Sequence, residues 1–187
     1  MALRQTPSQT VGPFFKPAMA LQQFTELADG RTRGQRVSIT GRVLDRDRAP
    51  VPDAMVEIWQ ANADGRYRHP DDAQEKLLDP HFAGFGRAAT DLSGRFRFAT
   101  IKPGSVPADA SILQAPHVNV SVFARGLLKR LSTRIYFDGE PLNERDPILL
   151  ATPADRRHTL ISVCNAAGEY EFDIVLQGNN ETVFFDV

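Results

Sequence analysis

The sequence predicts an all-β protein, a two-sheet β-sandwich with an irregular N-terminal arm and one or two short helices. Two observations predict this fold class: apolar and polar residues alternate with a period of two, and the alternating runs are short and separated by turn residues. A period of two places every second side chain on the same face of a strand, so each run is typical of a half-buried strand. Many short strands with regular turns favour two packed sheets.

Four alternating runs predict the main strands, and turn-forming residues stand between them. The runs extend from Val37 to Val43, Phe96 to Phe98, Val118 to Val122 and Tyr170 to Leu176. The turn signals are Pro50, Pro52, Asp64-Gly65, Ser93-Gly94, Pro103-Gly104 and Asp138-Gly139.

Helix signals are scarce. Thr152 is a good N-cap residue, Pro153 suits the first helical position, and Asp155 adds an acidic group to the first turn. The sequence therefore predicts one short helix over residues 153–161.

The first 35 residues show no clear period and are predicted to form an arm. They contain three phenylalanines, Phe14, Phe15 and Phe24, so we expect the arm to pack on its own domain or on a partner chain. At 187 residues, one domain spanning 1–187 is the expected organisation.

Composition argues against several function classes. With 22 Lys plus Arg against 23 Asp plus Glu, the net charge is −1, so neither nucleic-acid nor membrane binding is expected. The single cysteine, Cys164, has no partner for an internal disulfide, which fits a reducing compartment. The first residues, MALRQTPSQTVGPFF, lack the apolar run of a signal peptide. We therefore expect a cytoplasmic protein.

Four segments carry a family signature when they are taken together and in order. They are TPSQTVGPFF (Thr6–Phe15), PVPDAMVEIWQANADGRYRH (Pro50–His69), TDLSGRFRFATIKPG (Thr90–Gly104) and APHVNVSVFARG (Ala115–Gly126). The chain resembles the intradiol ring-cleaving dioxygenases, and within them the α-type subunits of the two-chain members that act on 3,4-dihydroxybenzoate (protocatechuate). The resemblance covers nearly the whole chain and implies the same β-sandwich.

The resemblance implies a ferric ion held by two tyrosines and two histidines, and this chain departs from that pattern. Phenolates are hard anionic donors that suit Fe(III), and imidazoles complete the pocket. Tyr67 and His117 match one ligand of each kind, whereas Val106 and Asn119 stand at the other two positions. A hydrocarbon cannot bind iron and an amide is a poor substitute for imidazole. We therefore expect no metal site here, and Tyr67 and His117 are expected to be hydrogen-bonded.

The resemblance also implies that an α-type subunit lines the substrate pocket of its partner. It assigns a substrate-binding role to Thr10, Gly12 and Pro13 of the arm and to Arg125 of the FARG motif. A guanidinium suits a benzoate-type substrate, whose carboxylate needs a compensating charge. In the simpler alternative, Gly12-Pro13 is a tight turn and Arg125 is a solvated residue at a strand end.

Two further features have simple structural explanations. Trp59 ends a strand pattern and is expected to pack in the core rather than stack on a substrate. A basic cluster is expected to form interface salt bridges or a solvated face; its members are Arg125, Lys129, Arg130 and Arg134.

The resemblance therefore implies a non-catalytic α subunit. Its homologous β subunit would hold the Fe(III) and cleave 3,4-dihydroxybenzoate with dioxygen to 3-carboxy-cis,cis-muconate, in an αβ unit and a higher oligomer. Two alternatives stay open. One is a self-sufficient dioxygenase with a rearranged iron site, and the other is a transthyretin-like, non-enzymatic binding module, which the PVPDA segment also resembles.

Overall fold

The strands and short helices follow one another as an all-β chain with little helix. The computed structural model describes residues 9–12, 14–20, 22–109 and 111–186. The strands are β1 (Arg36–Leu44), β2 (Met55–Gln60), β3 (Phe85–Ala89), β4 (Arg95–Ile101), β5 (Val106–Pro107), β6 (Leu113–Gln114), β7 (His117–Phe123), β8 (Leu131–Phe137), β9 (Ile161–Cys164), β10 (Glu169–Glu171) and β11 (Ile174–Val175). The helices are α1 (Phe15–Ala20), η1 (Pro141–Arg145), α2 (Pro147–Ala151) and η2 (Arg157–Leu160). The all-β prediction is confirmed.

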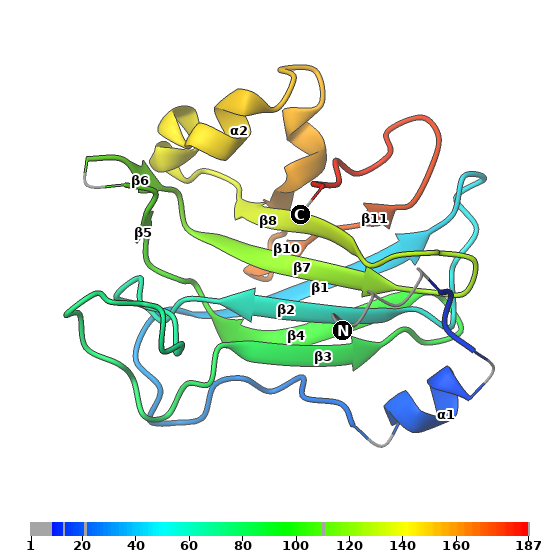
Figure 1. Cartoon of the computed structure of the whole chain (residues 1–187), viewed down its shortest axis with the longest axis horizontal. Helices are drawn as coiled ribbons and strands as arrows, with labels where there is room; N and C mark the ends of the chain where they lie inside the picture. The colour runs from blue at the N-terminus through cyan, green and yellow to red at the C-terminus, as the bar shows by residue number, and fades with distance from the viewer. Residues whose placement is uncertain (1–8, 13, 21, 110, 187) are drawn as a thin grey trace, which may run out of the picture.

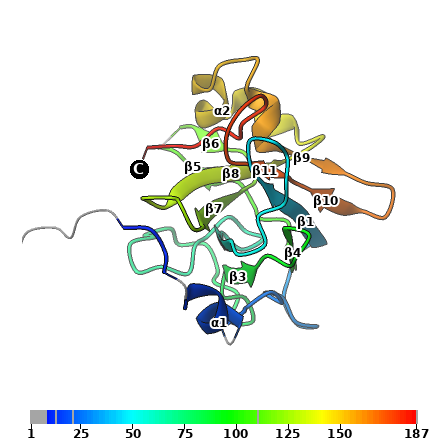
Figure 2. The ribbon, with the colours of Figure 1, turned by 90° about the vertical axis from the view of Figure 1, so that its right-hand side faces the viewer.

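The two layers of the molecule belong to one continuous sheet that folds over itself. Strands β3, β2, β7 and β8 lie in front of β1 and β10 in Figure 1. The layers are joined where β9 pairs in parallel with β8 and antiparallel with β10, which in turn pairs with β1. Figure 2 shows the helices α1 and α2 at opposite ends of the molecule. A separate hairpin, β5–β6, flanks the sheet.

The core lies between the layers and is built from the inward side chains of the alternating strands. Alternation on β2 and β7 buries every second residue, while the intervening residues remain on the outer face. The inward set includes Val56, Ile58, Val118, Val120 and Val122 of the front layer and Ile39, Phe96 and Phe98 of the back layer. The outer face of the front layer is therefore free to carry polar side chains.

The last strand run is interrupted, which the sequence did not predict. Residues expected as one strand form β10 and β11, both parallel to β1 in the same register. Between them, Asp173 Oδ1 accepts the backbone N–H of Arg42 at 3.0 Å, and Oδ2 pairs with the Arg42 guanidinium at 2.6 Å. A side chain therefore takes the place of a backbone acceptor at the break.

The predicted helix over residues 153–161 is wrong in its position. Thr152 is the C-cap of α2, because its N–H donates to the carbonyls of Ile148 and Leu149. Only η2, a short 3-10 helix, lies inside the predicted range. The N-cap and proline signature belongs to Asp146-Pro147, where the carboxylate accepts the N–H groups of Ile148 and Leu149.

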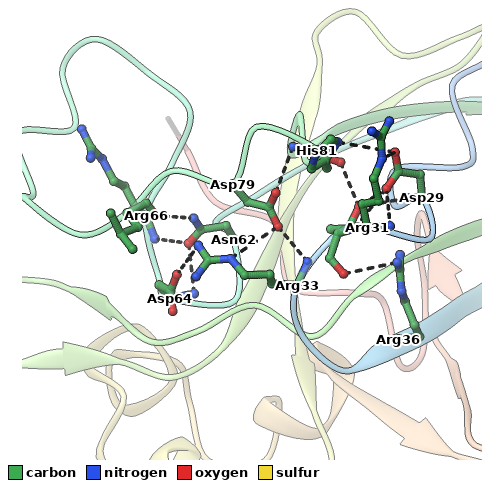
Figure 3. Close-up of polar contacts among 11 residues, drawn as sticks. Asp29, Arg31, Arg33, Arg36, Asn62, Asp64, Arg66, Asp79 and His81 are labelled. Atoms are coloured by element: carbon green, nitrogen blue, oxygen red, sulfur yellow. Dashed lines mark hydrogen bonds and ion pairs between the residues drawn. The ribbon is translucent and has the colours of Figure 1, made fainter.

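The later part of the predicted arm packs on its own domain. Phe24 exchanges two backbone hydrogen bonds with Arg87 of β3 (2.8 and 3.0 Å), and Leu27 is buried in the core. Figure 3 shows the polar contacts that tie residues 29–36 to the loop between β2 and β3. At their centre, burial alone would raise the pKa of Asp79, but the N–H groups of Arg33 (2.8 Å) and His81 (2.9 Å) hold it below its usual range.

None of the helices in the described part of the chain combines the length and apolar character that a membrane span requires.

Candidate functional site

Three of the four positions that match the family's metal ligands lie together. Tyr67 belongs to the loop between β2 and β3, where its N–H donates to Asp72 (2.7 Å). His117 and Asn119 are two residues apart on β7 and share its outer face. Both side chains contact the Tyr67 hydroxyl, His117 Nε2 at 3.3 Å and Asn119 Nδ2 at 3.0 Å.

The hydrogen bonds of this group run in one direction. His117 Nδ1 lies 2.7 Å from the carbonyl oxygen of Ala115, which can only accept, so Nδ1 carries the proton. Nε2 is then an acceptor and takes the Tyr67 O–H, whose oxygen accepts from the Asn119 amide. The result is a directed chain from Asn119 through Tyr67 and His117 to Ala115, in which the phenol and the imidazole are both neutral. The expectation that Tyr67 and His117 are hydrogen-bonded is confirmed.

Residues of β8 and of the α2 N-terminus surround the directed chain. Arg134 Nη1 donates to Gln114 Oε1 (2.6 Å) and to Tyr136 Oη (3.4 Å). Tyr136 in turn donates to Asp146 (3.0 Å), which is fully buried and also accepts the Ala115 N–H (2.8 Å). The arginine thus lies beside the phenols and the imidazole, while a carboxylate orients the turn that carries His117.

Burial and the nearby guanidinium set the protonation of these groups. Burial, aided by the charge of Arg134, lowers the pKa of His117 to about 4. Burial also raises the pKa of Tyr67 and of Tyr136 above the ordinary value, although Arg134 opposes this shift. The imidazole and both phenols are therefore uncharged at neutral pH.

The depressed pKa of His117 predicts a loss of stability in mild acid. The unfolded chain takes up a proton near pH 6.5, whereas the folded chain does so only near pH 4. The contribution of neutral His117 is fully present above pH 6.5 and falls by about 3 kcal/mol as the pH drops to about 4. Between pH 6.5 and about pH 4, the free energy of unfolding of the native chain should therefore fall by about 3 kcal/mol more than that of His117→Gln. Denaturant titrations at several pH values measure this difference.

The exposed His158 provides the control for this experiment. His158→Gln should reproduce the pH dependence of the native chain. Parallel stability curves for the native chain and His117→Gln would contradict the neutral imidazole.

The side chains present do not form a donor set for Fe(III). The proton of Tyr67 is held by His117, and Asn119 turns its NH2 group rather than a lone pair toward the phenol. Val106, at the remaining position, is a buried hydrocarbon paired with Gln114 on the β5–β6 hairpin. Within the described ranges there is no group of three His, Cys, Asp or Glu residues able to hold a metal. The absence of iron from this chain stays a prediction.

A second group contains the residues predicted to face a substrate. Thr10 Oγ1 accepts the backbone N–H of Gly126 at 2.8 Å, which fixes the arm beside the turn that carries Arg125. Gly12 lies two residues further along the arm and is exposed, with no atom within 4 Å of the position of a Cβ. Arg125 is 70% exposed and its Nε is paired with Asp53. Pro13 lies outside the described residues. The roles of all four stay predictions.

The two groups lie at opposite ends of β7. His117 is the first residue of the strand and Arg125 follows its last residue by two positions. A seven-residue strand is about 20 Å long. Figure 1 shows the first described part of the arm beside the turn between β7 and β8, at the end of the sheet away from the start of β7. Thr10, Gly12 and Arg125 are therefore not brought together with Tyr67, His117 and Asn119.

Two residues near the directed chain differ from expectation. Trp59, expected in the core, lies on the outer face of β2 and stacks on Tyr67 with ring centroids 5.8 Å apart. Arg134 is half-buried beside Tyr136 and Gln114 rather than on a solvated face, while the interface salt bridges that were the other expectation stay a prediction. Strand alternation was the available signal, because Ser132, Arg134 and Tyr136 share one face of β8.

Comparisons with known proteins agree with this geometry. A family model described as "Dioxygenase" matches residues 10–178. The protocatechuate 3,4-dioxygenase alpha chain of Burkholderia cepacia is 40% identical over 201 residues, covering 99% of this chain and 98% of the relative. The beta chain from the same organism is 44% identical over 163 residues, covering 82% and 69% respectively.

A solved structure extends the match to three dimensions. The dioxygenase domain of a dioxygenase carbohydrate-binding protein fusion from Streptomyces sp. SirexAA-E is 31% identical to this chain. Its TM-score is 0.64, with 94% of this chain and 99% of that chain covered. The chain therefore belongs to the intradiol ring-cleaving dioxygenases and is similar to their α chains over nearly its whole length.

Proposed function

We propose that this chain is the non-catalytic α subunit of a protocatechuate 3,4-dioxygenase. It would pair with a homologous β subunit that holds the Fe(III), in an αβ unit and a higher oligomer of the cytoplasm. The complex would cleave 3,4-dihydroxybenzoate with dioxygen to 3-carboxy-cis,cis-muconate. The existence of relatives named as an alpha chain and a beta chain in one organism supports such a pairing.

The observation that carries this proposal is the separation of the two residue groups along β7. Thr10, Gly12 and Arg125 lie about 20 Å from the positions that match the metal ligands. Residues at one end of a strand cannot line a small-molecule pocket at its other end. If Thr10, Gly12, Pro13 and Arg125 face a substrate, that substrate does not lie at the metal-ligand positions of this chain, which supports a site in a neighbouring chain.

The local chemistry at this end of β7 fits a carboxylate-bearing substrate. Asp53 engages only the Nε edge of Arg125, and no other acceptor within the described part of the chain binds its guanidinium. The two Nη groups could therefore form a charge-assisted pair with a substrate carboxylate. Gly12 has open space around its Cα, so a ligand or a partner chain could approach the backbone closely.

Metal content tests the proposal directly. Purified alone, this chain should contain no stoichiometric iron and lack the red tyrosinate-to-iron absorption band. Co-expression with the β-type homologue of the same organism should restore both the colour and the ring-cleaving activity, measured as dioxygen uptake with 3,4-dihydroxybenzoate. Stoichiometric iron in the isolated chain would overturn the proposal.

The same measurements separate the two alternatives. A self-sufficient dioxygenase would take up dioxygen without a second chain. A transthyretin-like binding module would neither take up dioxygen nor copurify with an iron-bearing homologue. Pull-down with the tagged chain, followed by metal analysis of the recovered complex, distinguishes this last case.

A further inference from the structure

The chain contains three Asp-Gly pairs, Asp29-Gly30, Asp64-Gly65 and Asp138-Gly139. An Asp-Gly pair can isomerise spontaneously, because glycine has no side chain to shield its amide nitrogen. In this reaction the glycine nitrogen attacks the Cγ atom of the preceding aspartate. The rate therefore depends on how the fold holds the side chain and the nitrogen, and the three pairs differ in this respect.

The first pair is held in an unreactive arrangement. Asp29 Oδ1 accepts the N–H groups of Arg31 (2.7 Å) and Thr32 (3.0 Å), which directs the carboxylate past the Gly30 nitrogen. The Arg31 N–H also keeps the pKa of Asp29 below its ordinary value, and an ionised carboxylate is a poor electrophile. Figure 3 shows Asp29 and Arg31 in this network.

The second pair is held by contacts on both of its reacting groups. Asp64 Oδ2 is paired with Arg33 at 2.9 Å. The Gly65 N–H donates to the carbonyl oxygen of Asn62 at 3.0 Å. A Cβ on Gly65 would collide with the carbonyl oxygen of Ser105, so the backbone here is closely packed. Closing a ring between Asp64 and Gly65 would break these contacts.

The third pair already has its reacting groups side by side. Asp138 Oδ1 accepts the N–H of Gly139 at 2.9 Å, so Cγ, which is bonded to Oδ1, is close to the attacking nitrogen. Holding two groups near contact speeds an intramolecular step. Both residues are exposed, and no atom lies within 4 Å of the position of a Cβ on Gly139. Water and a rearranged backbone therefore have room at this pair.

We propose that Asp138 is the site at which the folded chain isomerises to isoaspartate. The Gly139 nitrogen forms a bond to Asp138 Cγ, and the amide hydrogen and the side-chain hydroxyl leave as water, which closes a cyclic succinimide. Water then breaks the bond between the Gly139 nitrogen and the backbone carbonyl carbon of Asp138. The main chain now runs through Cβ and Cγ, and its composition is unchanged. This inference goes beyond the proposed function, because the reaction needs neither iron nor the β subunit.

The reaction acts on the next residue, Glu140. Its carboxylate is mostly buried, pairs with Lys102 (2.8 Å) and accepts the N–H of Leu142 (3.3 Å) as the N-cap of η1. The Glu140 N–H also closes the turn on the carbonyl oxygen of Phe137 at 3.3 Å. Isoaspartate adds one carbon atom to the main chain between Phe137 and Glu140, so this turn and the Glu140 contacts no longer fit together. The modified chain should therefore unfold at a lower denaturant concentration than the unmodified chain.

Ageing the folded full chain at physiological temperature and neutral pH tests the proposal. Peptide mapping by liquid chromatography and mass spectrometry separates aspartyl from isoaspartyl peptides of equal mass. Isoaspartate should accumulate at Asp138 roughly tenfold or more faster than at Asp29 or Asp64. In strong denaturant the three pairs should react at similar rates, because the fold no longer distinguishes them. Equal rates in the folded chain, or faster reaction at Asp29 or Asp64, would overturn the proposal.

Two variants locate the reaction without peptide mapping. Asp138→Glu keeps the charge but has to close a larger ring, so the total isoaspartate of the aged folded chain should fall to a small fraction of the native amount. An isoaspartyl carboxyl methyltransferase with a labelled methyl donor measures this total. Asp64→Glu is the matched control and should leave the total unchanged. Undiminished isoaspartate in Asp138→Glu, or a loss of the same size in Asp64→Glu, would contradict the assignment to Asp138.

Discussion

Replacing Asp146 with alanine should lower the free energy of unfolding by about 4 kcal/mol. The carboxylate is fully buried and accepts four hydrogen bonds. Its donors are Ala115 N, Tyr136 Oη, Ile148 N and Leu149 N, all at 2.8–3.0 Å. The alanine variant leaves these donors without an acceptor in the protein interior and removes the N-cap of α2. Chemical denaturation of native and variant chains measures the loss.

Asp109 provides the matched control for burial. Its carboxylate also accepts two backbone N–H groups, those of Ser111 and Ile112, but the residue is exposed. Asp109→Ala should cost less than about 1 kcal/mol, because water replaces the lost acceptor. Asp146→Asn keeps the size of the side chain but presents an NH2 group to surrounding donors, so its loss should lie between the two. Equal losses for the two alanine variants would show that burial of Asp146 contributes little.

Arg125→Ala, in the complex with the iron-bearing β-type homologue, should reduce kcat/KM for 3,4-dihydroxybenzoate roughly a hundredfold. The expected cause is loss of the charge that compensates the substrate carboxylate. Iron content and the absorption band should stay unchanged, because the proposal places all iron ligands in the β subunit and gives Arg125 a contact with the substrate only. Steady-state kinetics together with metal analysis of one preparation check both parts.

Two further variants test whether the charge itself is responsible. Asp53→Asn removes the negative charge beside Arg125 Nε without removing the cation, and should leave kcat/KM within a few fold of the native value. Arg125→Lys keeps the charge but lacks the planar fork, so it should recover only part of the loss. A drop in iron content with Arg125→Ala would assign this residue to the metal site or the subunit interface instead.

The strands that could be predicted from the sequence are those with one buried face. The alternation of Val118, Val120 and Val122 follows directly from β7 lying between the core and the outer face. The break between β10 and β11 could not be predicted, because it depends on Asp173 binding Arg42, 131 residues away. The helix was placed one segment too late because Thr152-Pro153 and Asp146-Pro147 carry the same signature, and only the backbone hydrogen bonds of α2 distinguish them.

In the candidate site, too, some contacts could be predicted from motifs within single segments, whereas others depend on the pairing of distant strands. The meeting of Tyr67 with His117 and Asn119 followed from the family motifs. The position of Arg134 did not follow from these motifs, because it is the pairing of β7 with β8 that puts Arg134 opposite Asn119. Trp59 was assigned to the core on residue type, whereas alternation with Ile58 turns it outward. A sequence motif covers one segment, so it does not predict which side chains are brought together by the pairing of two distant strands.

The one-way order of hydrogen-bond donors from Asn119 to Ala115 makes single substitutions toward a metal site unfavourable. Asn119→His alone would add an imidazole but remove the amide that donates to Tyr67, while the charge of Arg134 would still repel an incoming cation. A tyrosine at Val106 alone would overfill a buried position. Each single substitution that introduces a ligand of the family's metal set thus disturbs a packed or hydrogen-bonded position before the set is complete.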